Sequence, residues 1–229
     1  MALMTTDTRY TKVAIALHWA IAALILCNLA LGFFMEGFEQ PLRGFVIQTH
    51  ISSGITVLLL SIVRIVWRLT HRPPPFAPGT RGWEKGLAHL VHFLLYVAMV
   101  LMPLSGWALI SANPPPPPPG QIEAAPAPVP GGAAPAAAAP KARRGGPTKL
   151  WWVIPWPKIG PIQRMGTTPQ GIAEQKLLHD TLVERHMQIA WIIIALLVLH
   201  VGGALKHQFV DGQAEFARMG IGRGRRAPR

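Results

Sequence analysis

Several histidines stand out because they lie within or at the edge of long uncharged stretches, where polar side chains are costly. Two of them, His186 and His200, belong to one stretch and are fourteen residues apart. In a helix, fourteen residues make almost four turns and rise about 21 Å, so both imidazoles project from one face at two depths. Neutral imidazole is a common ligand of iron and other transition metals. One helix therefore offers metal ligands at two levels.

The uncharged stretches predict four membrane-spanning helices. They are residues 13–35, 44–63, 86–112 and 187–205. The shortest, with nineteen residues, would be about 28 Å long as a helix, close to the thickness of a bilayer core. The first stretch exceeds the apolar part of a signal peptide, so we interpret it as a retained helix. With 50% hydrophobic and 14% charged residues, the expected fold is all-α, a transmembrane four-helix bundle.

Basic residues near the helix ends predict the orientation in the membrane. The first connection contains only Arg43, whereas the second contains Arg68, Arg72, Arg81 and Lys85. Since Lys and Arg accumulate on the cytoplasmic side, both termini are expected to be cytoplasmic in a multi-pass protein of the bacterial inner membrane. Contact with the lipid bilayer accounts for much of the net charge of +12, and nucleic acid is not implied.

Alternating helix directions fix the depth of each histidine. His18 and His200 both lie about 8 Å inside the cytoplasmic ends of their spans, and His50 and His186 lie near the periplasmic ends. The two pairs match in depth across different helices, as the axial ligands of a six-coordinate haem iron must. The single cysteine, Cys27, and the absence of a C-x-x-C-H motif exclude covalent attachment, so two b-type haems are expected.

Other polar residues compete for these roles. His89 and His92 lie at the cytoplasmic end of the third span, where one of them could replace His18 opposite His200 or belong to a proton path or quinone site. Arg64 either snorkels to the interface or holds a haem propionate or quinone headgroup. A zinc or proton-transport site is a further alternative, but no Asp or Glu lies in the uncharged stretches to complete it.

The region between the third and fourth spans has two parts of different composition. Residues 113–147 contain twelve of the 23 prolines and predict a disordered periplasmic linker. Residues 148–183 contain three tryptophans that suit the membrane–water boundary, followed by a short helix. The predicted organisation is therefore residues 1–112 with three spans of a single four-helix domain, the linker 113–147, the Trp-rich loop 148–183, and residues 184–229 with the fourth span and a basic tail.

Several motifs resemble the prokaryotic cytochrome b561 family. They are H-W in the first span, T-H-I-S-S-G in the second, L-A-H-L-V-H in the third, and two histidines fourteen apart followed by G-G-A-L-K-H. The resemblance covers nearly all of the chain except residues 113–147. It implies an inner-membrane di-haem protein with one haem on His18 and His200 and the other on His50 and His186. Some members of this family oxidise superoxide and pass the electron to ubiquinone.

Two haems at two depths predict one-electron transfer across the membrane, and the resemblance implies superoxide as a small anionic donor and ubiquinone as acceptor. A positive field on the periplasmic side would concentrate such an anion. It would come from Lys149, Lys158, Arg164, Lys176 and Arg185. The alternatives are a haem-bearing anchor or electron-relay subunit for a periplasmic hydrogenase, dehydrogenase or soluble cytochrome, and a transporter or structural protein without haem. Whether the chain is itself an oxidoreductase enzyme stays open.

Overall fold

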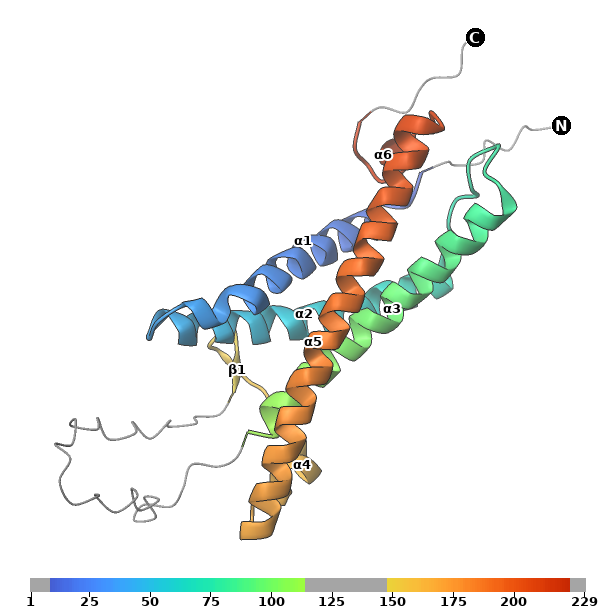
Figure 1. Cartoon of the computed structure of the whole chain (residues 1–229). Coiled ribbons are helices and arrows are strands. Elements are labelled where there is room, and N and C mark those ends of the chain that lie inside the picture. The colour runs from blue at the N-terminus through green and yellow to red at the C-terminus, as the bar shows by residue number, and fades with distance from the viewer. Residues whose placement is uncertain (1–8, 114–147, 223–229) are drawn as a thin grey trace, which may run out of the picture.

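The computed structural model describes residues 9–113 and 148–222 of the 229-residue chain (Figure 1). Within these two ranges, four helices are long and apolar enough to cross a membrane, α1 (Lys12–Phe34), α2 (Leu42–Thr70), α3 (Gly82–Ser111) and α5 (Pro169–Leu205). The predicted all-α transmembrane bundle is therefore confirmed. The predicted linker lies outside the described residues except for Asn113, and so does the basic tail beyond residue 222.

Shorter elements connect and extend the four long helices. They are η1 (Met35–Gly37), β1 (Lys149–Leu150), β2 (Ile154–Pro155), α4 (Gly160–Met165), η2 (Lys206–Val210) and α6 (Glu215–Arg218). The two strands pair antiparallel as a hairpin. The 3-10 turn η1 leads out of α1, and the π-helical turn η2 continues α5.

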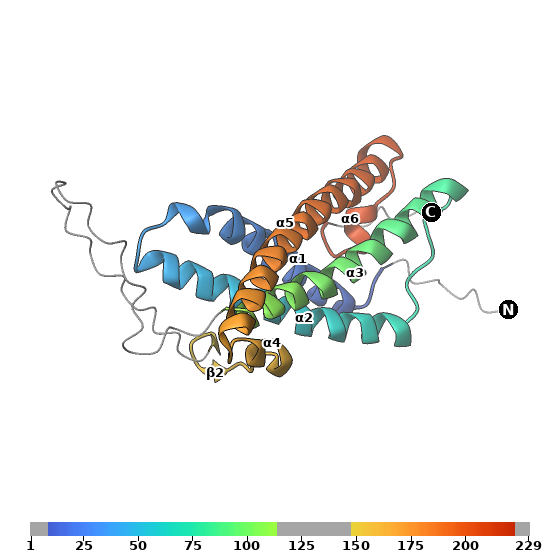
Figure 2. The ribbon, with the colours of Figure 1, turned by 60° about the horizontal axis from the view of Figure 1, so that its bottom comes forward.

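The long helices pack in chain order, α1 on α2, α2 on α3 and α3 on α5. In Figures 1 and 2, α1 and α2 lie side by side and α5 crosses them. A small core of Ile21, Val57 and Met99 joins the first three helices, and Tyr96 packs against it. Many large apolar side chains on the outside of the helices are exposed, as expected for surfaces that face lipid.

The first and last described residues meet at one end of the bundle. The backbone N–H of Tyr10 donates to the carbonyl of Arg218 at 3.2 Å, and the indole N–H of Trp19 donates to the carbonyl of Met219 at 2.9 Å. The connection of residues 71–81 lies at the same end, which we call the basic end. The opposite end, with β1, β2 and α4, we call the hairpin end (Figure 1).

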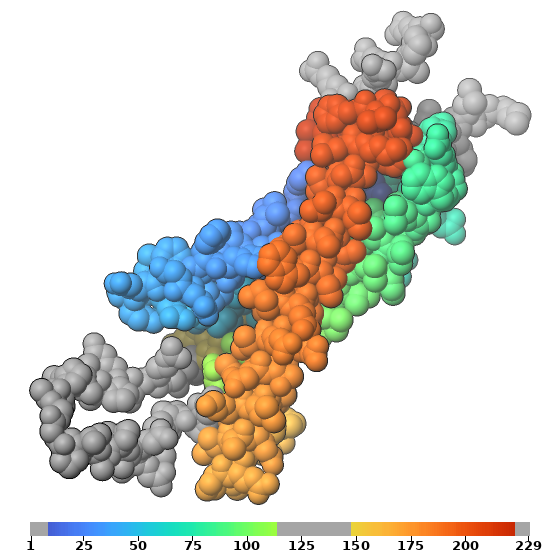
Figure 3. Space-filling view, in the orientation of Figure 1, coloured from blue at the N-terminus to red at the C-terminus, as the bar shows by residue number. Residues whose placement is uncertain are grey.

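Helix α5 is longer than the sequence suggests. Its start is capped by the Thr168 hydroxyl, which accepts from the backbone N–H of Gly171 at 3.0 Å, and Pro169 occupies the first turn. Its 37 residues make a helix about 55 Å long, well beyond a bilayer core of about 30 Å. The short helix expected before residue 184 is therefore continuous with the fourth span, and the expected boundary at residues 183 and 184 falls inside α5. In Figure 3, α5 forms one ridge from the hairpin end to the basic end.

The part of α5 at the hairpin end packs against α4. The fully buried Gln175 side chain donates through Nε2 to the carbonyl of Ile162 at 3.0 Å. Gly171 lies so close to α4 that an added Cβ would be 1.8 Å from the carbonyl oxygen of Met165. Only glycine fits at that contact, and the close approach fixes α4 beside α5.

Candidate functional site

At the hairpin end, α2 and α5 bring His50 and His186 together. Their ring centres are 6.1 Å apart, although the residues are far apart in the chain. His50 Nδ1 lies 3.1 Å from the carbonyl oxygen of Asn28 on α1. A carbonyl oxygen can only accept, so Nδ1 carries the proton and Nε2 keeps its lone pair. The second nitrogen of His50 is therefore free to bind a metal.

His186 is oriented in the same way by α3. Its Nδ1 lies 2.8 Å from the hydroxyl oxygen of Ser105, and that hydroxyl donates to the carbonyl of Met102 at 2.7 Å. Since the Ser105 proton is already committed, its oxygen accepts from Nδ1–H of His186. Metal-binding histidines usually hold their second nitrogen in this manner, which fixes the tautomer and the ring orientation.

Two glycines flank this histidine pair. An added Cβ at Gly32 would be 3.1 Å from Cε1 of His50, and one at Gly106 would be 3.2 Å from Cε1 of His186. Both distances are shorter than ordinary van der Waals contact, so larger residues would push the imidazoles out of place. Gly54, which follows His50 by one turn, instead faces α1, where an added Cβ would be 3.3 Å from Nδ2 of Asn28.

At the basic end, α1, α3 and α5 bring three histidines together. The ring centres of His18 and His200 are 6.1 Å apart, the same separation as in the other pair. His92 is closer to His200, with ring centres 5.0 Å apart, and its Nδ1 donates to the carbonyl of Ala88 at 2.6 Å. The competition between His18 and His92 that the sequence raised is thus present in the structure, whereas His89 packs against Phe76 instead.

Arg64 lies beside this group of histidines. Its Nη1 donates to the carbonyl of Ala14 on α1 at 3.0 Å. No Asp or Glu in the described part of the chain forms an ion pair with it. Its positive charge is close enough to interact electrostatically with the imidazoles of His18 and His200. A cation placed this way suits an anionic group bound among the histidines, because a charge within a membrane span calls for a partner.

The histidine pairs fit haem better than an isolated metal ion. A transition metal lies about 2.0 Å from an imidazole nitrogen, so two imidazoles on opposite sides of one ion have ring centres roughly 6 Å apart, in agreement with the observed 6.1 Å. Within residues 9–113 and 148–222, no three His, Cys, Asp or Glu side chains form a cage for a metal ion. A porphyrin supplies the remaining ligands itself, so two axial histidines suffice.

Cys27, His179 and Arg185 belong to neither histidine pair. The Cys27 thiol is exposed. His179 forms a 3.2 Å contact with its neighbour Asp180. The guanidinium of Arg185, next to His186, donates to Gln188 Oε1 at 2.8 Å. Sequence reasoning missed Asn28, Gly32, Ser105 and Gly106, since only the packing of neighbouring helices places them against histidines.

The Trp-rich segment forms the β1–β2 hairpin against α2, near His50. The Trp151 backbone N–H donates to the hydroxyl of Ser52 at 2.9 Å, and its indole N–H donates to the hydroxyl of Thr56 at 3.1 Å. The Trp152 ring stacks on Phe45 with ring centres 4.9 Å apart. The hairpin therefore braces the outer side of the helix that carries His50.

Comparison with known proteins gives a consistent result. Residues 9–222 match the family model described as "Prokaryotic cytochrome b561". The chain is 23% identical to "Cytochrome b561 homolog 2" of Escherichia coli (strain K12) over 225 residues, which cover 96% of this chain and 95% of that protein. It is 29% identical to "Probable superoxide oxidase CybB" of Yersinia pestis over 44% of this chain and 58% of that protein. It is 37% identical to "Cytochrome b562" of Cereibacter sphaeroides over 45% of this chain and 67% of that protein.

Proposed function

Since this chain belongs to the prokaryotic cytochrome b561 family, we propose that it carries single electrons across the bacterial inner membrane between two haems b. The observation that supports this most directly is the repetition of one arrangement at two levels of α5, where His186 and His200 each face a histidine of another helix at 6.1 Å. The fourteen residues between them correspond to about 21 Å of helix. The two sites are thus stacked through the membrane.

We propose His18 and His200 as the axial ligands at the basic end, and His50 and His186 at the hairpin end. Haem b, when bound, supplies an iron that accepts and gives up one electron. The chain positions the imidazoles, through the Asn28 carbonyl and the Ser105 hydroxyl. The four imidazoles are half-buried in the bundle, and burial is one of the factors that tune the potential of a haem protein.

The direction of transfer follows from the proposed topology. The basic end carries Arg68, Arg72, Arg81 and Lys85, so we place it in the cytoplasm and the hairpin end in the periplasm. A periplasmic donor would then reduce the haem between His50 and His186. Ubiquinone would accept the electron on the cytoplasmic side.

Superoxide is our proposed donor. Residues 148–185 hold five basic residues, Lys149, Lys158, Arg164, Lys176 and Arg185, against three acidic ones, Glu174, Asp180 and Glu184. A positive local field raises the concentration and the encounter rate of a small anion. The Yersinia pestis relative, which is named a probable superoxide oxidase, supports the same donor.

The decisive experiment is a haem count with matched histidine variants. Purified protein, His18→Ala, His50→Ala, His186→Ala, His200→Ala and the control His179→Ala would be compared by absorption spectrum and pyridine haemochrome assay. We expect two haems b per chain in the parent and in His179→Ala, and one disturbed haem in each other variant. A colourless parent after expression with ample haem would contradict the proposal. The pairing would be contradicted if the two variants of one pair, such as His50→Ala and His186→Ala, disturbed different haems.

The donor is tested separately, with superoxide generated enzymatically and ubiquinone reduction followed optically. We expect quinone reduction to depend on superoxide, to fall with rising ionic strength, and to be slower in Arg185→Gln than in the parent. Unchanged haem spectra in Arg185→Gln would serve as the control. Quinone reduction that is indifferent to superoxide would exclude this donor while leaving the di-haem arrangement intact.

A second function, an electron-relay subunit for a periplasmic redox protein, is favoured by the tip of the hairpin. Val153 is 76% exposed and Ile154 is 57% exposed, which gives the periplasmic face an apolar contact surface. In that case a periplasmic hydrogenase, dehydrogenase or cytochrome would co-purify and reduce the haems. Deleting residues 113–147 together with the following tryptophans would abolish both effects.

A further inference from the structure

Arg64 is a half-buried positive charge within the second membrane span. A charge inside a span calls for an opposite charge nearby. The acidic residues at the basic end of the described structure form ion pairs with other side chains, Glu84 and Asp211 with Lys206, and Glu215 with Arg218. The described residues therefore leave the charge of Arg64 uncompensated.

One hydrogen bond holds the Arg64 guanidinium against α1. Its Nη1 donates to the carbonyl of Ala14 at 3.0 Å, and Arg64 makes no other side-chain hydrogen bond among the described residues. A guanidinium has five N–H donors in a planar fork whose shape matches a carboxylate. Most of this fork is therefore open to a bound group.

The contacts between α1 and α2 place Arg64 about one turn outside the level of His18. At the hairpin end, His50 contacts the carbonyl of Asn28. Fourteen residues further along α2, Arg64 contacts the carbonyl of Ala14, which is fourteen residues further back on α1. In this register His18 is level with residue 60, and Arg64 lies about 6 Å nearer the basic end.

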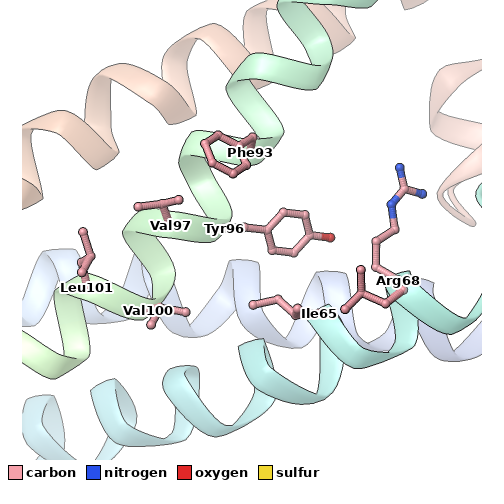
Figure 4. Close-up of a pocket in the computed structure, with 8 residues that line it drawn as sticks. Ile65, Arg68, Phe93, Tyr96, Val97, Val100 and Leu101 are labelled. Carbon is pink, nitrogen blue, oxygen red and sulfur yellow. The ribbon is translucent and has the colours of Figure 1, made fainter.

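Arg68, the next arginine of α2, occupies a different place. The guanidinium of Arg64 is close enough to interact electrostatically with both proposed ligands, His18 and His200. Arg68, one turn further along α2, lines a groove between α2 and α3 (Figure 4). None of the four proposed haem ligands lines that groove. Of these two arginines, Arg64 is therefore the one beside the proposed haem position.

A carboxylate compensates the charge of Arg64 better than a quinone does. Haem b carries its propionates on one edge, and they are anionic at neutral pH. A propionate accepts N–H groups from the guanidinium fork and also neutralises its charge. The carbonyl oxygens of ubiquinone accept hydrogen bonds but carry no charge, so they would leave a cation uncompensated within the span.

We propose that Arg64 binds a propionate of the haem at the basic end. The inference rests on the proposed axial ligands His18 and His200, which come from α1 and α5, and it gives α2 a part in the same site. The Ala14 carbonyl holds one nitrogen of the guanidinium, and the propionate occupies the open N–H groups. The propionate edge of this haem is thereby directed toward the basic end.

The first test is a redox titration of the purified holoprotein. A cation near the iron favours the reduced state, which carries one positive charge less. We therefore expect Arg64→Gln to lower one of the two midpoint potentials and to leave the other at the parental value. Arg64→Lys, which keeps the charge, should restore most of the lowered potential. Arg68→Gln removes the same charge one turn away on α2, and this matched control should keep both potentials close to those of the parent.

A modified haem tests the propionate directly. The full chain is produced in a host that cannot make haem and is supplied with equal amounts of haem b and its dimethyl ester, in which the propionates are neutral. A background with His50→Ala and His186→Ala leaves the basic-end haem to be extracted and counted by chromatography. We expect this background to favour haem b over the ester. Arg64→Gln should reduce that preference about tenfold, whereas Arg68→Gln should keep it.

Parental midpoint potentials in Arg64→Gln would overturn the proposal, and so would an unchanged preference for haem b over the ester. Equal effects of Arg64→Gln and Arg68→Gln would also overturn it, because they would indicate a general effect of charge. Slower quinone reduction in Arg64→Gln with an unchanged preference would assign Arg64 to the quinone instead. A parent without haem would remove the proposed function and this inference together. Two haems per chain with a preference that is indifferent to Arg64 would remove the inference alone.

Discussion

His186 Nδ1 lies 2.8 Å from the hydroxyl oxygen of Ser105, a residue 81 positions away on another helix. The hydroxyl proton is used in a 2.7 Å bond to the Met102 carbonyl, so the oxygen receives the imidazole N–H. This contact selects the tautomer in which Nδ1 of His186 carries the proton and Nε2 keeps its lone pair. A single serine on α3 thus fixes the tautomer and the ring orientation that a histidine on α5 needs to bind a metal.

Ser105→Ala tests whether the hydrogen bond to His186 contributes to haem binding. Loss of such a hydrogen bond lowers metal affinity about tenfold or more, so we expect the haem at His50 and His186 to be lost first during purification and its midpoint potential to shift. Haem content and a redox titration measure both effects. Thr70→Ala is the control, since Thr70 donates within its own helix at 2.9 Å. Equal haem content and potentials in the two variants would show that Ser105 has no such role.

His92 and His18 can be told apart at the basic end. We propose His18 as the ligand although His92 is nearer to His200, because only His18 repeats the 6.1 Å separation of the other pair. His18→Ala is expected to convert one low-spin haem to high spin or to lose it, whereas His92→Ala keeps two low-spin haems. Electron paramagnetic resonance distinguishes these states. The reverse pattern would assign His92 as the ligand.

The strained Trp turn predicts an effect on stability. Trp151 and Trp152 have φ values of 48° and 63°, a left-handed conformation that side chains other than glycine adopt only at a cost. Ser52 offsets part of that cost, because its buried hydroxyl accepts from the Trp151 backbone. Ser52→Ala should therefore destabilise the protein by about 1–2 kcal/mol, measured by thermal unfolding, and expose the hairpin to protease.

A matched variant separates the Trp turn from general effects on α2. Thr49→Ala removes a hydroxyl that donates only to the Phe45 carbonyl of the same helix, at 2.9 Å. We expect parental protease resistance of the hairpin in Thr49→Ala. If the hairpin of Ser52→Ala were cleaved no faster than that of Thr49→Ala, the brace would not depend on Ser52.

Acidification should loosen the basic end through Asp211. The hydrogen bond from Lys206 Nζ, at 2.8 Å, and a second from His207 hold the pKa of Asp211 below its ordinary range. A carboxylate with a lowered pKa stabilises the folded state above its unfolded pKa of about 3.9, and this contribution disappears as the pH falls through the lower folded pKa. Asp211→Asn should thus melt below the parent at neutral pH.

The thermal midpoints of Asp211→Asn and the parent should converge below about pH 4. A difference that persists unchanged at pH 3 would indicate a contribution from packing instead of charge. Glu215→Gln is a suitable control, because the ion pair between Glu215 and Arg218, at 3.5 Å, is longer than the ion pairs of Asp211 with Lys206 and His207.

The sequence alone determined the four spans and the depth of each histidine, because hydrophobic length and helical rise are local properties of the chain. It also indicated the family, which the match over residues 9–222 confirms. The spacing of His186 and His200 on one helix predicted two levels without any coordinates. The proposed ligand pairing itself remains a prediction that the haem count will test.

Only the tertiary structure decided what surrounds those histidines. Ser105 and Asn28 contact imidazoles because of how neighbouring helices are rotated and how close they pack, and neither quantity is encoded in the spacing along one helix. The nearness of His92 to His200 has the same origin. The continuity of α5 depends on contacts with α4, where Gly171 and Gln175 pack against a segment whose fold local sequence does not specify. The depth of each histidine follows from the rise per residue along its own helix. The side chains that contact it are decided by the packing of one helix on another.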